Sequence, residues 1–319
     1  MFNYTKEEIS KLAKENGFRN ETFEKVLRLI DVLNFINTNK ILSSYLVLKG
    51  GTAINLTIFK LPRLSVDIDL DFSHNGSRED MLIKREEISS ILKKYMEING
   101  YFVNNESKFK FALDSFVFSY NNDFGNKDNL KIEINYLNRV HIYEPIVREV
   151  SIVFFKSFKV LTLNKYELFG SKIKALIERC TIRDVYDVYH MIEESLFKDD
   201  EYELIKKCTI FYLAIGNTSK RNLIEELEDF HRKIDSFVAD RIPQYLSSTL
   251  RNNDKFSMKE VAMIVKKFID KLMILDESEK NFLNSFKNKE YRPEMLFHDQ
   301  SILERIKEHP MAVWKILNS

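Results

Sequence analysis

Hydrophobic and polar positions follow two different periods along the chain. Residues 4 to 39 carry apolar side chains three and four apart, which predicts two amphipathic helices, the first with Thr5 as its N-cap. The run YLVLK at 45–49 is short and apolar, and SVDIDLDF at 65–72 alternates strictly, so both predict strands. Between them, TAINLTIFK has helical spacing.

The change of period places a domain boundary near residues 160–165. A long amphipathic helix is expected up to Gly100, and the aromatic, β-branched runs from 101 to 163 predict a mostly antiparallel sheet. From Leu163 onward the segments are all helical in pattern. We therefore expect an α+β fold, with a mixed or antiparallel sheet and flanking helices in residues 1–163 and an all-helical domain in residues 164–319.

Length and composition limit the number of domains, the kind of binding site and the location of the protein. A length of 319 residues agrees with about two domains. The 49 basic and 48 acidic residues nearly cancel, so any nucleic-acid site must be a local patch. Cys180 and Cys208 lack metal-ligand spacing and are expected to be buried. With no signal-peptide or membrane-span pattern, we expect a cytoplasmic protein that does not bind membranes.

Three acidic residues alternate with apolar ones in the strand at 65–72. Because side chains alternate between the two faces, Asp67, Asp69 and Asp71 share one face and the apolar residues share the other. Carboxylates this close repel one another unless a cation is bound, and oxygen ligands favour Mg²⁺ or Mn²⁺. A solvated acidic edge strand is the alternative, and Asp71, near the expected strand end, is the weakest ligand candidate.

Gly50 and Gly51 stand between a strand and a helix, ahead of these acids. Glycines at this position let the backbone approach a ligand closely. The N-terminus of the helix can direct its backbone amides at an anion, and Thr52 can add a hydroxyl group there. An ordinary tight turn is the alternative. The order of glycine turn, helix and acidic strand favours a site for a nucleoside triphosphate and its metal ion.

A third carboxylate is expected from the strand-like run LKIEINYL. Glu133 shares a strand face with Lys131 and Asn135, whereas Ile132, Ile134 and Tyr136 occupy the other face. Glu133 is either the third metal ligand, beside Asp67 and Asp69, or a charge on the surface of the sheet.

Four blocks of the sequence resemble the AbiEii-type nucleotidyltransferase toxins, the toxic half of type IV toxin–antitoxin systems. These blocks are KGGTAI (49–54), RLSVDID (63–69), ELFGSKIKAL (167–176) with Arg179, and RDVYD (183–187). The resemblance implies a DNA polymerase β-like nucleotidyltransferase fold. It implies that Asp67 and Asp69 bind the metal ion and that Asp67 is also catalytic. It further implies that the triphosphate binds near Lys49, Gly50, Gly51, Thr52 and Ser65.

The resemblance also implies that Lys172 and an aspartate of the RDVYD block are required for activity. On one continuous helix, Lys172, Arg179 and Arg183 would fall on one face, with Asp187 nearby. This cationic face would line the cleft, with Lys172 neutralising the triphosphate and the arginines binding phosphates. Asp187 is the preferred catalytic partner. Asp184 could instead brace an arginine or cap a second helix, and ion pairing on a solvated helix is the general alternative.

The resemblance implies metal-dependent nucleotidyl transfer to the 3′ end of tRNA, which would block translation and serve in phage defence by abortive infection. The donor is a nucleoside triphosphate, GTP or CTP. A genetically paired antitoxin is expected, which need not bind the toxin directly. Two alternatives remain: nucleotidyl transfer to a small molecule or a protein, and a GTP-binding, growth-inhibiting protein without transfer.

Overall fold

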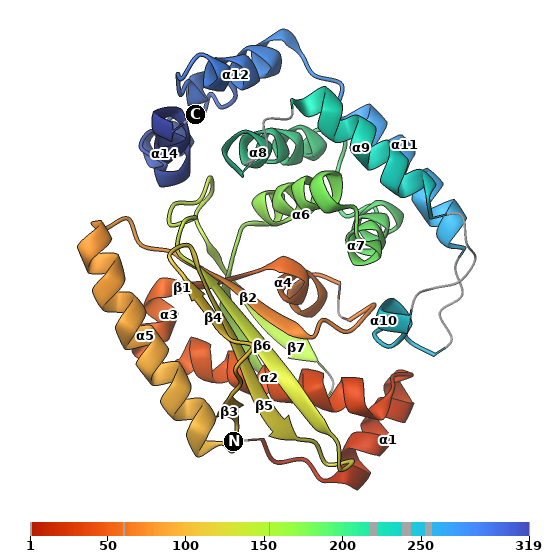
Figure 1. Cartoon of the computed structure of the whole chain (residues 1–319). Helices are drawn as coiled ribbons and strands as arrows, with labels where there is room; N and C mark the ends of the chain where they lie inside the picture. The colour runs from red at the N-terminus through yellow and green to blue at the C-terminus, as the bar shows by residue number, and fades with distance from the viewer. Residues whose placement is uncertain are drawn as a thin grey trace. The chain divides into compact units, whose positions relative to one another are not determined.

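A computed structural model describes residues 2–59, 61–152, 154–216, 222–237, 244–252 and 257–318, and the chain divides into two compact units (Figure 1). Unit 1 comprises Met1–Arg139, Pro145–Leu163 and Ser247–Asp254. Unit 2 comprises Val140–Glu144, Asn164–Leu246 and Lys255–Ser319. The main break between the units follows Leu163, and each unit also receives a short segment from the other's part of the sequence.

Unit 1 contains the sheet and five helices of the described chain. The helices are α1 (Lys6–Asn16), α2 (Asn20–Thr38), α3 (Lys40–Tyr45), α4 (Gly50–Thr57) and α5 (Arg78–Ile98). The strands are β1 (Leu46–Lys49), β2 (Asp67–Phe72), β3 (Phe102–Val103), β4 (Lys108–Lys110), β5 (Leu113–Asn121), β6 (Lys127–Asn135), β7 (Ile146–Ile152) and β8 (Phe155–Thr162). The predicted cap of α1 is confirmed, because Thr5 and Glu8 form a reciprocal capping box.

The sheet is mixed, in the order β3-β5-β6-β2-β1-β8-β7, and β4 also pairs with β5. Strand β1 runs antiparallel to β2, whereas β2 pairs in parallel with β6 and β1 with β8. The antiparallel pairs β5–β6 and β7–β8 fall in the region where the sequence predicted them. The parallel pairs place β2, the acidic strand, in the interior of the sheet rather than at an edge.

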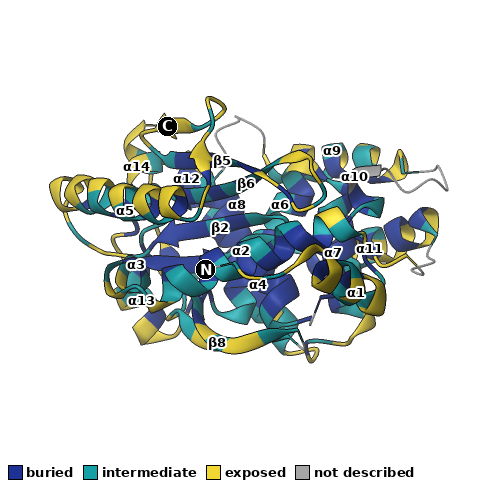
Figure 2. Ribbon diagram, turned by 90° about the horizontal axis from the view of Figure 1, so that it is seen from below, coloured by how far each residue is buried: buried dark blue, intermediate teal, exposed yellow. Residues whose placement is uncertain are grey.

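One face of this sheet is apolar and forms the core of unit 1. Its residues from β2, β5 and β6 are at most 1% exposed: Ile68, Leu70, Phe72, Phe116, Phe118, Ile132 and Ile134. Helices α2 and α5 lie on this face, since Arg28 of α2 lies over the Tyr120 ring and Lys93 of α5 over the Phe116 ring. Each buried large side chain contributes roughly 1.5–3 kcal/mol. In Figure 2, β2 is dark blue and the outward face of α5 is yellow.

Unit 2 is helical throughout its described part. Its elements are α6 (Lys165–Arg179), α7 (Ile182–Glu193), α8 (Glu201–Gly216), α9 (Leu223–Asp235), α11 (Met258–Leu272), α12 (Glu277–Lys287), the 3₁₀ turn η1 (Pro293–Met295), α13 (Gln300–Ile306) and α14 (Pro310–Asn318). The short α10 (Gln244–Ser247) falls at the boundary of the two units. The expected α+β fold with a helical C-terminal region is confirmed.

Helices α6 and α8 pack closely at Gly170. A Cβ added there would overlap the Cβ of Cys208 and lie 3.1 Å from the backbone nitrogen of Thr209. Both cysteines of the chain are buried thiols, as expected. None of the helices in the described part of the chain combines the length and apolar character needed to span a bilayer.

Residues 172 to 187 do not form the one continuous helix on which the cationic face depended; they agree with the alternative of a second helix. Helix α6 ends at Arg179, Cys180 adopts a left-handed conformation (φ 48°), and α7 begins at Ile182 with Thr181 as its N-cap. The predicted stripe along one helix therefore does not exist. The residues assigned to it lie instead on two helices joined by a tight turn.

Candidate active site

The parallel pairing of β2 with β6 arranges the candidate carboxylates of unit 1. In this register Asp67 lies opposite Lys131, Asp69 opposite Glu133, and Asp71 opposite Asn135. Residues directly opposite in a sheet project from the same face. Asp67, Asp69 and Glu133 therefore share the face that lies opposite the apolar core, as the alternation predicted.

Asp69 packs directly against Gly50, the first residue of α4. A Cβ on Gly50 would overlap Oδ2 of Asp69 and lie 3.1 Å from its Cβ and Cγ. Gly50 also has a left-handed backbone (φ 69°), which side-chain-bearing residues adopt at a cost of about 1–2 kcal/mol. Both conditions require glycine at position 50, so Gly50 makes room for the acidic strand as well as starting a helix.

Thr52 ties the start of α4 to the start of β2. It is fully buried, its hydroxyl donates to the carbonyl oxygen of Asp67, and it lies 2.9 Å from the hydroxyl of Ser65. In these contacts Thr52 and Ser65 hold the backbone that presents Asp67. That either residue contacts a triphosphate stays a prediction.

Lys49 forms an ion pair with Asp71, the third acid of β2. The side chain of Asp71 is only 2% exposed and lies within β2 rather than past its end, so our placement of this residue was wrong. Burial raises the pKa of Asp71, and the charge of Lys49 offsets part of that rise. Lys49, 22% exposed at its side chain, thus stabilises Asp71 and lies opposite Asp69 in the register.

Glu133 pairs with Lys131, its neighbour two residues back on the same face of β6, at 2.9 Å. Burial alone would lower the pKa of Lys131, but its hydrogen bond to Glu133 and the charges of Glu133, Asp67 and Asp69 raise it. The charge of Lys131 therefore interacts with the charges of three carboxylates, those of Glu133, Asp67 and Asp69. The carboxylates are all-oxygen donors of the kind that Mg²⁺ and Mn²⁺ prefer. That Asp67, Asp69 and Glu133 bind a metal ion stays a prediction.

A different set of acids forms the tightest carboxylate group among the described residues. Oxygens of Glu203, Asp276 and Glu279 in unit 2 lie within 4.8 Å of one another. The ammonium group of Lys206 is 2.7 Å from Glu279 and already supplies a cation there. Asp276 is also occupied as the N-cap of α12. The ion pair between Lys206 and Glu279 joins α8 to α12 at this group.

In unit 2, Lys172 is buried between two aspartates of α7. Its Nζ lies 3.0 Å from Oδ1 of Asp184 and 2.8 Å from Oδ2 of Asp187, and all three residues are at most 7% exposed. The contact runs from α6 to α7 rather than along one helix. The structure therefore brings Lys172, Asp184 and Asp187 together, although not by the geometry we expected.

Asp184 accepts hydrogen bonds from Arg179 and Thr181 in addition to its ion pair with Lys172. Arg179 donates to both of its oxygens, at 2.7 and 2.9 Å, and the Thr181 hydroxyl donates at 2.6 Å. Burial opposes ionisation, but Lys172, Arg179 and Thr181 together hold the pKa of Asp184 well below its usual range. The alternative in which Asp184 braces an arginine and helps to cap a second helix is confirmed.

Sequence reasoning missed Thr181, which caps α7. Its signal is the spacing Thr-x-x-Asp from 181 to 184, a variant of the capping pattern. Arg179 keeps 61% of its side chain exposed, whereas Tyr186 is buried, as expected. Arg183 lies on α7, in the first turn beside Asp184.

Glu167, in the third block of the sequence, holds the segment 140–144 against α6. Its carboxylate accepts the backbone N–H groups of Ile142 and Tyr143 and the hydroxyl of Tyr212, and His141 lies 3.7 Å away. Burial raises the pKa of Glu167, and these partners counteract the rise. The acid explains why this segment belongs to unit 2.

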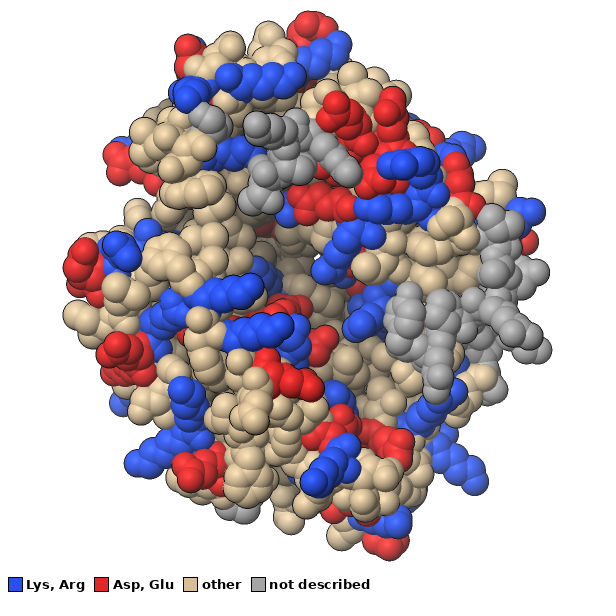
Figure 3. Space-filling model, viewed as in Figure 1, with Lys and Arg blue, Asp and Glu red and all other residues tan. Residues whose placement is uncertain are grey.

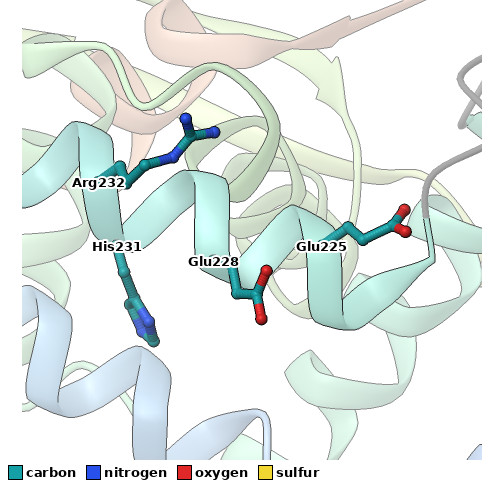
Figure 4. Close-up of a pocket in the computed structure, with 4 residues that line it drawn as sticks. All are labelled: Glu225, Glu228, His231 and Arg232. Carbon is teal, nitrogen blue, oxygen red and sulfur yellow. The ribbon is translucent and has the colours of Figure 1, made fainter.

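A hollow of about 500 Å³ lies along α9, lined by Glu225, Glu228, His231 and Arg232 (Figure 4). None of these residues belongs to the candidate site, and three have local partners. Glu225 closes the capping box of α9, His231 contacts Asp270 at 2.6 Å, and Arg232 pairs with Asp229. The hollow therefore contains none of the candidate catalytic residues.

An acidic strand next to a glycine-initiated helix in a mixed sheet is the arrangement expected from the sequence for a nucleotidyltransferase. The family model "Nucleotidyl transferase AbiEii toxin, Type IV TA system" matches residues 35–272, and the chain belongs to this family. The chain is also similar to the structure of MenT4, a nucleotidyltransferase toxin from Mycobacterium tuberculosis. The TM-score is 0.63 at 14% identity, with 98% of this chain and 99% of the other covered, so the two share a fold. Comparison with curated proteins gives no match.

Proposed function

We propose that the protein transfers a nucleotide from a nucleoside triphosphate to the 3′ end of tRNA, in a reaction that requires Mg²⁺ or Mn²⁺. The observation that carries this proposal is the register of β2 and β6. It sets Asp69 opposite Glu133, with Asp67 on the same face, beside the glycine-initiated N-terminus of α4. Membership of a nucleotidyltransferase toxin family supports the reaction type.

Asp67 and Asp69 would hold the metal ion, with Glu133 as a further ligand. A divalent ion held there would supply positive charge beside the triphosphate. In the transfer the acceptor hydroxyl loses its proton and bonds to the α-phosphorus, while the bond from the α-phosphorus to the departing pyrophosphate breaks. The first backbone N–H groups of α4, at Gly50 and Gly51, have no partner within the helix and suit phosphate oxygens. Thr52 and Ser65 maintain the position of Asp67 during this step.

In this proposal nucleotidyl transfer also requires three residues of unit 2: Lys172, Arg183 and Asp187. Modification of tRNA would block translation and stop growth, in keeping with a toxin that acts in the cytoplasm in phage defence. The antitoxin of the pair would oppose this effect, with or without direct binding.

The test is a transfer assay with purified protein, each α-³²P-labelled nucleoside triphosphate, Mg²⁺ and total RNA. We expect label in tRNA-sized RNA with one nucleotide, either GTP or CTP, and none with Asp67→Ala. Label in protein or in small molecules instead would identify another acceptor. If no triphosphate gives label while GTP still binds, the protein is a nucleotide-binding inhibitor and the proposal is wrong.

A growth assay provides an independent test in cells. Expression of the wild-type chain should arrest growth, and expression of Asp67→Ala to the same level should not. Equal toxicity of the two proteins would show that toxicity does not depend on metal-assisted transfer.

A further inference from the structure

The face of the sheet that bears the acids continues beyond β6 to the short edge strand β4. In register, Asp69 of β2 lies opposite Glu133 of β6, Glu133 opposite Ser115 of β5, and Ser115 opposite Lys108 of β4. Lys110 follows two residues later on β4. Because opposite residues share a face, Lys108 and Lys110 project on the same side of the sheet as the acids.

The position of Phe109 independently confirms which way β4 faces. Its ring packs edge-on against the Phe116 ring at 5.1 Å, and Lys93 of α5 lies over it at 4.9 Å. Phe116 belongs to the apolar face covered by α5. The residues on either side of Phe109 must therefore point to the opposite, acidic face.

Lys108 and Lys110 are both exposed, and neither ammonium group forms an ion pair with another described residue. By contrast, the lysines nearer the acids are engaged, Lys49 with Asp71 and Lys131 with Glu133. Polar groups continue along the same face, where Asn104 donates to Ser119 and Ser119 to Asn129, each at 2.8 Å. The outer part of the acidic face is thus cationic and polar, with positive charge available to an anion.

We propose that Lys108 and Lys110 bind backbone phosphates of an unpaired 3′ end of nucleic acid whose terminal hydroxyl reaches Asp67 and Asp69. This inference rests on the proposed transfer reaction and specifies its acceptor. Three strand spacings of about 4.8 Å separate β2 from β4, roughly 14 Å in all. At about 3.4 Å per stacked nucleotide, this distance corresponds to about four unpaired nucleotides. A free nucleoside, a dinucleotide or a blunt duplex end cannot occupy both positions at once.

Overall charge does not produce this site. Basic and acidic side chains are interspersed over the face drawn in Figure 3, in keeping with a net charge of +1. An acceptor therefore has to be recognised locally. Edge-strand lysines also discourage pairing with strands of other molecules. If that were their only role, removing the charges would cause aggregation without changing the affinity for nucleic acid.

The experiment measures binding of a fluorescent six-nucleotide RNA to the full-length protein by anisotropy, with Mg²⁺ and without nucleotide, from 50 to 200 mM salt. Each phosphate contact in a single strand contributes about 0.7 to the slope of log affinity against log salt. The variant Lys108→Gln/Lys110→Gln should therefore lose about 1.4 from this slope. The wild type should lose about sevenfold more affinity than the variant over this range.

The matched control is Lys93→Gln/Lys94→Gln on α5, which removes two charges from the other side of the sheet. Its salt slope should equal that of the wild type, and size-exclusion chromatography should show all three proteins at the same size. Equal slopes for wild type and Lys108→Gln/Lys110→Gln would overturn the inference. So would aggregation of that variant with unchanged affinity of its soluble fraction.

Transfer kinetics separate this inference from the proposed function. With a hexanucleotide acceptor, Lys108→Gln/Lys110→Gln should raise KM and leave kcat unchanged, whereas a dinucleotide acceptor should show no difference. If the wild type transfers label and both proteins have the same KM for the hexanucleotide, the inference fails and the function stands. If the wild type transfers nothing but its binding depends on these lysines, the function fails and the binding surface stands. DNA of the same sequence tests whether the 2′-hydroxyl contributes.

Discussion

The carboxylate of Asp69 lies against the backbone of Gly50, so that the acidic strand and the glycine-initiated helix meet at one point. Strand β1 ends at Lys49, which pairs with Asp69 across the antiparallel ladder, and the chain then turns into α4. The turn requires a left-handed residue, and the neighbouring acid leaves no room for a side chain. The glycine and the acid are therefore parts of one local structure.

Substitution Gly50→Ala should lower both stability and transfer activity. The left-handed backbone at Gly50 costs alanine about 1–2 kcal/mol, and the new Cβ displaces Asp69 as well. Gly100→Ala is a matched control, because Gly100 also has a positive φ (79°) but nothing within 4 Å of an added Cβ. Urea denaturation should show a lower free energy of unfolding for both variants. The rate of nucleotidyl transfer should fall at least 100-fold only for Gly50→Ala. Normal transfer by Gly50→Ala would show that the position of Asp69 is not critical.

Glu133→Gln should weaken metal binding more than it weakens folding. The substitution removes one of the four carboxylates on the acidic face, of which Asp71 already pairs with Lys49, and it removes the ion pair between Glu133 and Lys131. We expect a higher Mg²⁺ concentration at half-maximal transfer rate and a change below about 1 kcal/mol in the free energy of unfolding, because the pair is partly exposed. Lys131→Gln removes the same ion pair but no carboxylate. An equal shift in the Mg²⁺ requirement for both variants would assign the effect to the pair rather than to ligation.

The sequence predicts much of unit 1 because its signals are local. Strict alternation identifies β2 and the face of its acids, and the capping pattern at Thr5 identifies the start of α1. The position of Glu133 opposite Asp69 could not be predicted from local signals, because the register between β2 and β6 depends on a parallel pairing of segments about 60 residues apart. Local periodicity contains no information on that pairing, so Glu133 remained a choice between two roles.

The helical unit shows a second limit. Helix α6 ends at a left-handed cysteine rather than at a glycine, so the usual stop signal is missing at Cys180. The cationic face was considered on the condition of one continuous helix, and that condition is not met. The family blocks nonetheless contain residues that meet in the structure, because Lys172 reaches Asp184 and Asp187 across the contact between α6 and α7.

Lys172→Met should destabilise the protein by roughly 3–5 kcal/mol, because it removes the ammonium group that pairs with buried Asp187 and, together with Arg179, with buried Asp184. Loss of activity in this variant alone therefore does not demonstrate a catalytic role. In Lys172→Met/Asp187→Asn the charge imbalance is smaller, so part of the lost stability should return while transfer stays absent. Return of transfer together with stability would make Lys172 a structural residue.

Lys174→Met provides the control for removal of a nearby lysine from α6. Lys174 pairs with Glu178 at the partly exposed surface of the same helix, a contact worth about 0.2–0.5 kcal/mol. Urea denaturation should therefore show a change several-fold smaller than that of Lys172→Met. A similar loss for both variants would attribute the effect to the helix surface rather than to the buried cluster.

Stability should fall in mildly acidic solution because of His309. This residue is fully buried, with Nε2 3.0 Å from the carbonyl oxygen of Val140 and its ring edge-on to Phe211. Burial, with a contribution from His141, lowers the pKa of His309 to about 3. Between pH 3 and about 6.5 the unfolded chain therefore binds a proton that the folded protein does not. The stabilisation is complete above pH 6.5 and is lost as the pH falls, by roughly 2 kcal/mol at pH 5.

The variant His309→Gln should abolish this part of the pH dependence, since glutamine retains an N–H donor for Val140 but does not titrate. Urea denaturation at pH 7, 6 and 5 should give a smaller decrease in the free energy of unfolding for the variant than for the wild type. His298→Gln, which removes an exposed imidazole, serves as the control and should retain the wild-type slope. If His309→Gln and the wild type lose stability in parallel, the acid sensitivity originates in another group.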